Sequence, residues 1–191
     1  MSISALLFIL LASIFSTPVF AETYTVEKVI DGNTLKLSNG ETVRFIGMHA
    51  PESQPNEIAK IESQRTGVDI KIINKMGQEA KEFVKKLVEG KKVRLEFDYE
   101  RKDPYGRLWA YVYELVCLGD CAIETKQGYE YYKLDDGWYI FVNATIVKSG
   151  YASPRIIPPN VKYINLFREL YVEAMKNKAG LWQNNKNNRS N

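Results

Sequence analysis

The chain has 191 residues, 45% of them hydrophobic, and its 26 basic and 23 acidic side chains leave a formal net charge of +3. Without a 21-residue leader, the remaining 170 residues (191 minus 21) would form one domain that buries roughly two-thirds of its unfolded surface. A domain of this size needs no disulfide to form a stable core. The charge is only mildly basic, so charge alone does not indicate a nucleic-acid partner.

The first 21 residues have the pattern of a signal peptide. They contain no charged side chain, carry an apolar run from Ala5 to Ile14, and end in Val19-Phe20-Ala21, a small-x-small cleavage site. We therefore expect cleavage after Ala21 and a secreted or periplasmic protein. The apolar run is too short to span a bilayer comfortably and no second one follows, so we do not expect a membrane anchor.

Alternating apolar residues predict three consecutive strands at residues 23–30, 34–38 and 41–47. Asn39-Gly40 between the last two predicts a tight type I′ turn. Because antiparallel strands return to their origin, this hairpin brings residues 31–33 close to residues 48–52. Acidic, amide and imidazole side chains therefore gather beyond its ends, and Arg44 points away from the apolar face.

The rest of the chain alternates helical and strand patterns. Residues 54–74 have no clean period, which predicts a mobile loop or a short helix. We then expect a helix from Lys75 to a Gly90 cap and strands at 92–97 and 108–116. An inserted hairpin within Gly119–Tyr139, with a turn at Asp136-Gly137, is followed by expected helices at Asn143–Lys148 and Tyr163–Lys178. Residues 183–191 are polar and rich in asparagine, which predicts a disordered tail.

Cys117 and Cys121 lie four residues apart. In an exported protein, this spacing favours a local disulfide. A zinc site is the weaker alternative, because it requires four ligands and the single histidine, His49, comes from a distant motif.

Two separate motifs resemble those of the thermonuclease (staphylococcal nuclease-like) family. The first is Asp31-Gly32-x-Thr34 followed by Arg44 and Pro51-Glu52, and the second is Asp103-Pro-Tyr-Gly-Arg107 followed by Leu-Trp-Ala-Tyr. The similarity extends from about Tyr24 to Trp182. It implies a mainly β or α+β domain over residues 22–182, a five-stranded Greek-key OB-fold barrel with about three helices packed outside.

The resemblance also implies roles for individual residues. Glu52 corresponds to the general base, and Arg44 and Arg107 correspond to arginines that contact the phosphate, a task that suits the planar guanidinium fork. The alternatives are a surface glutamate after a proline turn and solvated arginines. Tyr105 is expected to stack on a nucleotide or to pack in its turn, and Arg155 to hold the polyanion or to be solvated.

Asp31, Asn33, His49 and the backbone carbonyl of Ala50 occupy the positions that resemble the family's calcium site. Two of them depart from the family pattern, which has aspartate where this chain has Asn33 and His49. Calcium prefers charged oxygen ligands, whereas imidazole nitrogen suits manganese, nickel or zinc better. We therefore expect a site that binds calcium weakly, has changed metal, or has lost it.

The sequence thus predicts an exported, monomeric nuclease that hydrolyses DNA and RNA with low sequence specificity. The main alternative is a nucleic-acid-binding module that kept the fold but lost catalysis, which the changes at Asn33 and His49 favour. A third alternative is an interaction domain without a nucleic-acid partner, supported only by the modest charge.

Overall fold

The computed structural model describes residues 23–184, so the predicted leader and nearly all of the predicted tail lie outside the described residues. The strands are β1 (Tyr24–Asp31), β2 (Thr34–Leu37), β3 (Thr42–Phe45), β4 (Met48–His49), β5 (Lys92–Glu96), β6 (Leu108–Leu118), β7 (Tyr131–Leu134), β8 (Gly137–Phe141) and β9 (Ser153–Pro154). The helices are α1 (Glu57–Thr66), α2 (Ile70–Val88), α3 (Val142–Lys148), α4 (Ile164–Lys176) and the 3₁₀ helix η1 (Gly180–Asn184).

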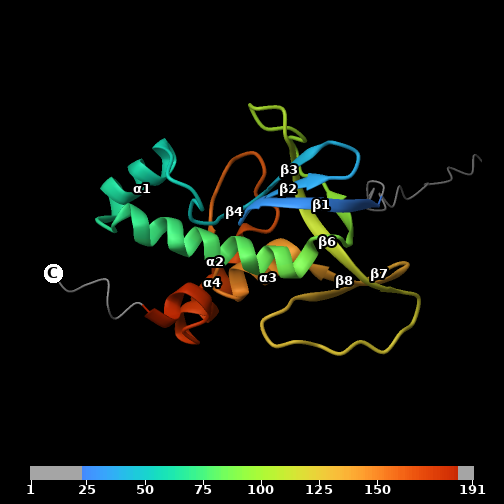
Figure 1. The fold of residues 1–191 in the computed structure, drawn as a ribbon. Helices are drawn as coiled ribbons and strands as arrows, with labels where there is room; N and C mark the ends of the chain where they lie inside the picture. Colours follow the sequence, from blue (N-terminus) through green and yellow to red (C-terminus); the bar gives the residue numbers. More distant parts are fainter. Residues whose placement is uncertain (1–22, 185–191) are drawn as a thin grey trace, which may run out of the picture.

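Five strands close into a barrel. Antiparallel pairing gives the order β3-β2-β1-β5-β6, and a parallel pairing between β3 and β6 joins the two ends (Figure 1). Closure leaves these five strands without an unpaired edge, as in an OB-fold. The fold predicted from the family resemblance is confirmed.

The hairpin of β2 and β3 differs from the predicted turn. Gly40 has a φ of 87°, but Lys178 is the only non-glycine residue with a positive φ in residues 23–184, so Asn39 does not adopt the type I′ conformation. The Gly40 N–H donates to the Leu37 carbonyl at 2.9 Å, which makes a three-residue loop ending in a left-handed glycine. The type I′ prediction was wrong, and the resulting register places Thr34 opposite Arg44.

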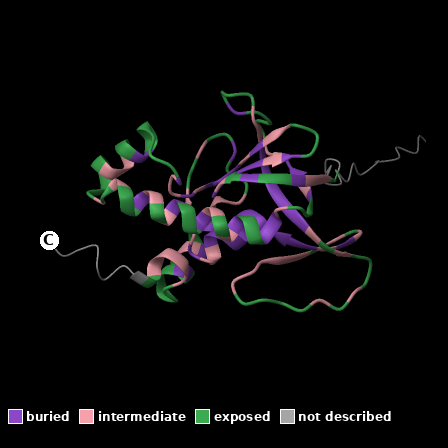
Figure 2. Ribbon diagram, viewed as in Figure 1, coloured by how far each residue is buried: buried purple, intermediate pink, exposed green. Residues whose placement is uncertain are grey.

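Helix α2 covers one side of the barrel (Figures 1 and 2). Its buried side chains include Ala80, Val84 and Leu87, which lie at helical spacing and join the barrel core. The helix begins five residues before the predicted Lys75, because the side chain of Asp69 caps it by accepting from the Lys71 N–H at 2.7 Å.

The segment predicted as a loop or short helix forms α1 and the first turns of α2. Asn56 caps α1 by accepting from the Ala59 N–H at 2.8 Å, and Gly67, with a φ of 72°, ends it. The described part of the chain therefore has four α-helices where about three were expected.

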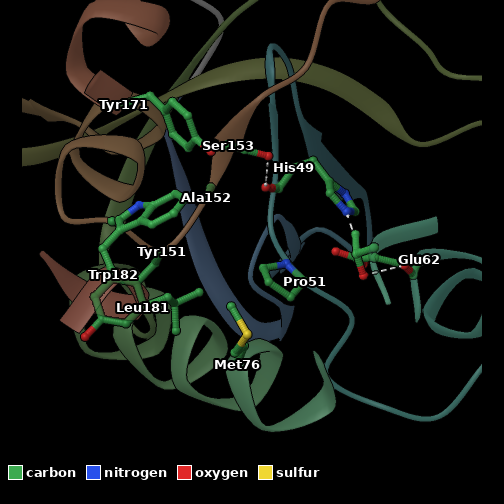
Figure 3. A pocket seen from close by; sticks show the side chains of 12 residues that line it. His49, Pro51, Glu62, Met76, Tyr151, Ala152, Ser153, Tyr171, Leu181 and Trp182 are labelled. Atoms are coloured by element: carbon green, nitrogen blue, oxygen red, sulfur yellow. Dashed lines mark hydrogen bonds and ion pairs between the residues drawn. The ribbon is translucent and has the colours of Figure 1, made fainter. Parts of the chain in front are cut away.

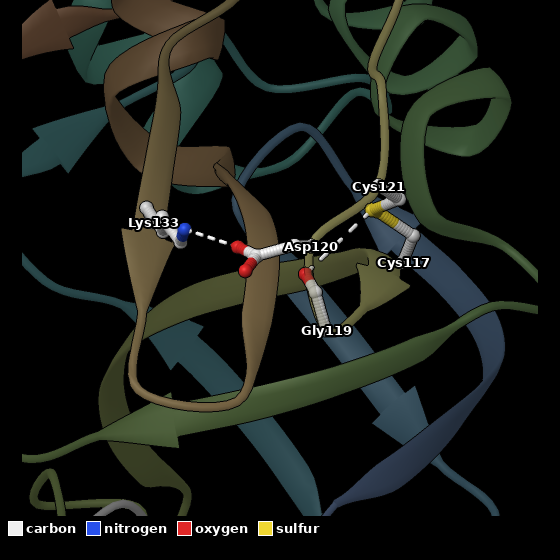
Figure 4. Close-up of a disulfide and its surroundings, with 5 residues drawn as sticks. All are labelled: Cys117, Gly119, Asp120, Cys121 and Lys133. Carbon is white, nitrogen blue, oxygen red and sulfur yellow. Dashed lines mark hydrogen bonds and ion pairs between the residues drawn. A yellow bond between two sulfur atoms is a disulfide. The ribbon is translucent and has the colours of Figure 1, made fainter.

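The inserted hairpin, β7 and β8, pairs with β6 and extends the sheet beyond the barrel. Its turn lies at Asp135-Asp136, one residue earlier than predicted, because Gly137 already pairs in β8. Cys117 and Cys121 are joined in a disulfide where β6 leaves the sheet, which confirms the predicted pairing (Figure 4). Lys133 forms an ion pair with Asp120 beside it.

The C-terminal helices complete the domain. At the start of α3, the buried Asn143 donates to the Ile46 carbonyl at 3.0 Å and accepts from the Val112 N–H at 2.9 Å, which ties the end of β3 to β6. Trp182 packs edge-on against Tyr171 of α4, with ring centroids 5.4 Å apart. Within residues 23–184, no helix has the length and apolar character needed to cross a membrane.

Candidate active site

Arg44 of β3 is the centre of the predicted polar cluster. Its guanidinium Nη1 donates to Asn33 Oδ1 and, at 3.0 Å, to the Thr34 hydroxyl, and it lies 3.9 Å from Asp31 Oδ1. The hairpin register explains these contacts, since β2 places Thr34 directly opposite Arg44. Asp31 also accepts from the Asn33 N–H at 2.8 Å, so the turn between β1 and β2 presents its side chains to the arginine.

The charges around Arg44 show which residues share this site. Burial lowers the pKa of the Arg44 guanidinium from its ordinary value. The same pKa is raised or lowered by four neighbouring charged groups: it is raised by the carboxylates of Asp31 and Glu52 and lowered by the guanidinium groups of Arg107 and Arg155. The predicted catalytic residues Glu52 and Arg107 therefore lie within electrostatic reach of the third, Arg44, as do the predicted metal ligand Asp31 and Arg155.

Helix α2 positions the backbone of Glu52. Asn74 donates from Nδ2 to the Glu52 carbonyl at 3.0 Å, and Gln78 donates to the next carbonyl, that of Ser53. A Cβ at Gly77 would overlap the Glu52 carbonyl, so the helix approaches this closely only because residue 77 is glycine. The Glu52 carboxylate in turn accepts from Asn56 Nδ2 at 2.8 Å.

A buried carboxylate positions Arg107. Asp103 is 8% exposed, and its Oδ2 accepts from Arg107 Nε at 2.6 Å. Its Oδ1 accepts the backbone N–H groups of Tyr105 and Arg107 at 2.9 and 3.0 Å. The turn and the guanidinium that it carries are therefore held by a single side chain.

The two predicted nucleic-acid contacts are exposed. Tyr105 is 84% exposed, and the Arg107 guanidinium lies over its ring, 5.3 Å from the ring centroid. The exposed Arg155 follows β9, where its backbone N–H donates to the Gly47 carbonyl at 2.8 Å.

The turn between β1 and β2 also contacts the segment before Glu52. A Cβ at Gly32 would lie 2.6 Å from Ala50 Cβ and 3.1 Å from Ala80 Cβ of α2. The predicted approach of residues 31–33 to residues 48–52 is thus confirmed at Gly32 and Ala50, and it depends on glycine at position 32.

The His49 side chain faces α1. Its Nε2 lies 3.6 Å from Glu62 Oε2, and its Nδ1 is buried without a hydrogen-bond partner (Figure 3). Asn33 Oδ1 is already bonded by Arg44. No group of three or more His, Cys, Asp or Glu residues within 23–184 is arranged to hold a metal ion. The donor set of Asp31, Asn33, His49 and Ala50 does not fit a calcium ion, because Asp31 supplies its only carboxylate.

Sequence reasoning missed the residues that position the charged groups. Asp103 was noted only as part of a motif, although an aspartate at the start of a glycine-containing turn favours bonds to the following backbone N–H groups. Asn56 had a helix-capping signal in Asn-Glu-Ile-Ala. Nothing in the local sequence indicates the long-range contacts of Asn74 and Gln78 with the Glu52 segment.

A closed OB-fold barrel with arginines and a carboxylate gathered at one place defines a class of protein built to hold a phosphate ester. Comparison with known proteins agrees. The family model described as "Staphylococcal nuclease homologue" matches residues 42–184. The chain belongs to the staphylococcal nuclease family, and with it to the nuclease class of enzymes.

Individual relatives span most of the chain. It is 34% identical over 172 residues to "Thermonuclease" of Staphylococcus intermedius, which covers 88% of this chain and 80% of that protein. It is 30% identical over 167 residues to "Thermonuclease" of Staphylococcus hyicus, covering 85% and 77%. With "Endonuclease YncB" of Bacillus subtilis (strain 168) it shares 32% identity over 164 residues, 83% of this chain and 60% of that protein.

Proposed function

We propose that this protein is an exported, monomeric nuclease that hydrolyses phosphodiester bonds in DNA and RNA with low sequence specificity. The observation that carries the proposal is the convergence of Glu52, Arg107 and Arg155 on the half-buried Arg44, which the turn residues Asn33 and Thr34 hold by hydrogen bonds. Membership of the staphylococcal nuclease family supports the reaction, and the relatives named thermonuclease and endonuclease support the substrate class.

In the proposed reaction, Glu52 accepts a proton from the attacking water while the water oxygen bonds to phosphorus. The ester P–O bond breaks, and the departing oxygen takes a proton from solvent. Arg44 and Arg107 donate hydrogen bonds to the phosphoryl oxygens, where negative charge develops. Asn56 orients the Glu52 carboxylate and Asp103 orients Arg107, so both groups are held before substrate binds.

The calcium ion implied by the family resemblance is not assigned a step. Its expected ligands include one carboxylate, an amide oxygen already bonded by Arg44, and a histidine that faces Glu62. Manganese or zinc would gain more than calcium from an imidazole nitrogen. The described partner of the His49 imidazole, however, is Glu62 and not Asp31.

The test is digestion of plasmid DNA, single-stranded DNA and RNA by the parent, Glu52→Gln and Arg107→Ala. Each substitution should lower kcat by about a hundredfold or more, because it removes a group aimed at the transition state. Glu57→Gln, which removes an exposed carboxylate from α1, is the matched control. Near-parental turnover by either active-site variant, with unchanged melting, would overturn the assignment.

A nucleic-acid-binding module without catalysis is the second candidate, and the poor calcium donor set favours it. The two candidates separate in one experiment, in which the parent is mixed with labelled single-stranded DNA in calcium, manganese, zinc or chelator. A nuclease gives shorter products in at least one condition, whereas a binding module gives a shifted band of intact DNA in all of them.

A further inference from the structure

A groove lies between α1 and the β4–β9 bridge, next to the proposed active site. Its volume is about 350 Å³, within the range of pockets that hold small ligands. Ile58, Ile61 and Arg65 of α1 line one side, and Ser153 and Arg155 line the other.

Arg155 connects the groove with the active site. Its side chain lines the groove, and its positive charge lowers the pKa of Arg44. Arg155 is therefore shared by the groove and by the surroundings of Arg44, so a chain bound at the Arg44 cluster can extend along Arg155 into the groove. The β4–β9 pairing of His49 with Ser153 forms the base between the two sites.

The charges of the groove favour an anion. The lining contains two arginines and one acidic residue, Glu62, whose Oε2 lies 3.6 Å from His49 Nε2. Within residues 23–184, the guanidinium groups of Arg65 and Arg155 make no ion pair or side-chain hydrogen bond. Two arginines thus retain their full hydrogen-bonding capacity, which suits phosphate oxygens.

The apolar part of the groove is exposed. Ile58 and Ile61 are 55% and 61% exposed. The buried residue of α1 is Ala59, with which the helix contacts the domain. Contiguous exposed apolar side chains beside basic groups match the chemistry of an unpaired nucleotide, which presents a phosphate together with an apolar sugar and base face.

We propose that this groove binds a nucleotide of single-stranded substrate just beyond the dinucleotide step that is cleaved. Arg65 contacts the phosphate of that nucleotide, and Ile58 and Ile61 pack against its sugar or base. The proposal rests on the proposed nuclease function and extends its binding site onto α1. A duplex does not fit the groove in this way, because its base faces are stacked inside the helix.

The test compares Arg65→Gln with Lys60→Gln. Both remove one positive charge from α1, but Lys60 pairs with Glu57 at 3.3 Å and does not line the groove. For a single-stranded oligonucleotide of about 12 nucleotides, Arg65→Gln should raise KM about three- to tenfold, and the slope of log KM against log salt should fall by about 0.7. Its kcat, and its KM for a dinucleotide, should stay at the parental values, as should all constants of Lys60→Gln.

Ile61→Ser tests the apolar contact independently, and should raise the KM for the oligonucleotide about threefold because it removes apolar surface that the nucleotide covers. Equal oligonucleotide KM values for Arg65→Gln, Ile61→Ser and Lys60→Gln would overturn the groove assignment while leaving the nuclease proposal intact. So would a loss for Arg65→Gln that is equally large with the dinucleotide.

If the parent cleaved nothing, the nuclease proposal would fail, and the groove would still be testable. Fluorescence anisotropy of a labelled oligonucleotide on the uncleaving protein should then show weaker binding for Arg65→Gln than for Lys60→Gln. Equal binding of the oligonucleotide by the two variants would overturn the groove assignment. So would a parent protein that binds duplex DNA as tightly as single-stranded DNA.

Discussion

Arg107 Nε lies 2.6 Å from Asp103 Oδ2, and the two residues are four positions apart in one turn. The same carboxylate accepts two backbone N–H groups of that turn. Asp103 is therefore the positioning residue for an arginine that we place on the phosphate.

Asp103→Asn should lower kcat about tenfold or more, because it replaces a charge-assisted hydrogen bond to Arg107 with a weaker contact or a donor. The turn keeps one oxygen for its backbone N–H groups, so the loss of thermal stability should be small. Steady-state kinetics and calorimetry check this. Glu100→Gln, an exposed change in the same loop, is the control. Parental kcat for Asp103→Asn would contradict the positioning role.

Gly77→Ala should lower both stability and turnover. The new methyl group would overlap the Glu52 carbonyl, so α2 or the Glu52 segment must move, at a cost of about 1–3 kcal/mol. Gly67→Ala is the comparison, because its φ of 72° makes alanine strained while nothing lies near the new methyl group. Melting temperature should fall for both variants, and kcat should fall for Gly77→Ala alone. Equal kcat for the two would show that α2 does not position Glu52.

The sequence predicts local elements better than their contacts. Alternation in β1 and β5 and the apolar face of α2 follow from side-chain periodicity. The two strands were found within one residue of their expected positions, and α2 begins five residues earlier than expected. The parallel pairing of β3 with β6 is a long-range contact that no local period encodes. Strand order therefore came from the family resemblance.

The candidate site divides in the same way. The motifs identified Arg44, Glu52 and Arg107, which the fold brings together. They did not reveal that His49 faces Glu62, because Glu62 belongs to a helix in a segment without a clear period. The contact depends on how α1 packs, which is a tertiary property.

Glu114→Gln should raise the melting temperature at neutral pH. Burial raises the pKa of the Glu114 carboxyl above its ordinary value of 4.5, although Lys91, 3.3 Å away, lowers it in part. The folded state therefore binds a proton that the unfolded state has lost, and stability falls as pH rises through the interval above 4.5. The neutral glutamine avoids this loss.

Calorimetry of parent and Glu114→Gln at two pH values checks this prediction. The gain should be present at about pH 7 and should vanish below the ordinary pKa, where both forms of the protein carry a neutral group. Each 1 kcal/mol would shift the melting temperature by about 2–4 °C. Glu124→Gln, in the exposed segment after Cys121, is the control. A lower melting temperature for Glu114→Gln at neutral pH would mean that its pairing with Lys91 outweighs burial.

The disulfide between Cys117 and Cys121 should contribute no more than about 2 kcal/mol to stability, because the loop it closes is short and restricts the unfolded chain little. The double variant Cys117→Ser/Cys121→Ser should therefore remain folded, with parental kcat. Urea denaturation measures the difference in unfolding free energy. Intact mass with and without alkylation checks that the parent is oxidised when it is taken from the compartment to which we propose it is exported, and two alkylatable thiols there would contradict the pairing.

The last prediction concerns calcium. Asn33→Asp adds a carboxylate beside Asp31. One of its oxygens still accepts from Arg44, but the other replaces an amide nitrogen that has no partner and can bind calcium, so calcium binding should tighten by about tenfold, or roughly 1.4 kcal/mol. His49→Asp should add less by itself, because the new carboxylate would face Glu62, whose Oε2 now lies 3.6 Å from the imidazole. Removing that repulsion with Glu62→Gln should restore the full effect.

Calcium titrations followed by thermal shift measure these affinities without relying on activity. The series is the parent, Asn33→Asp, His49→Asp, His49→Asp/Glu62→Gln, and Glu62→Gln as the control for the lost glutamate. His49→Asp/Glu62→Gln should bind calcium more tightly than His49→Asp, because two carboxylates that face each other without a shared ion destabilise the site. A parent that saturates at the same calcium concentration as Asn33→Asp would show that its donor set already fits the ion. The poor fit would then no longer favour a binding module over a nuclease.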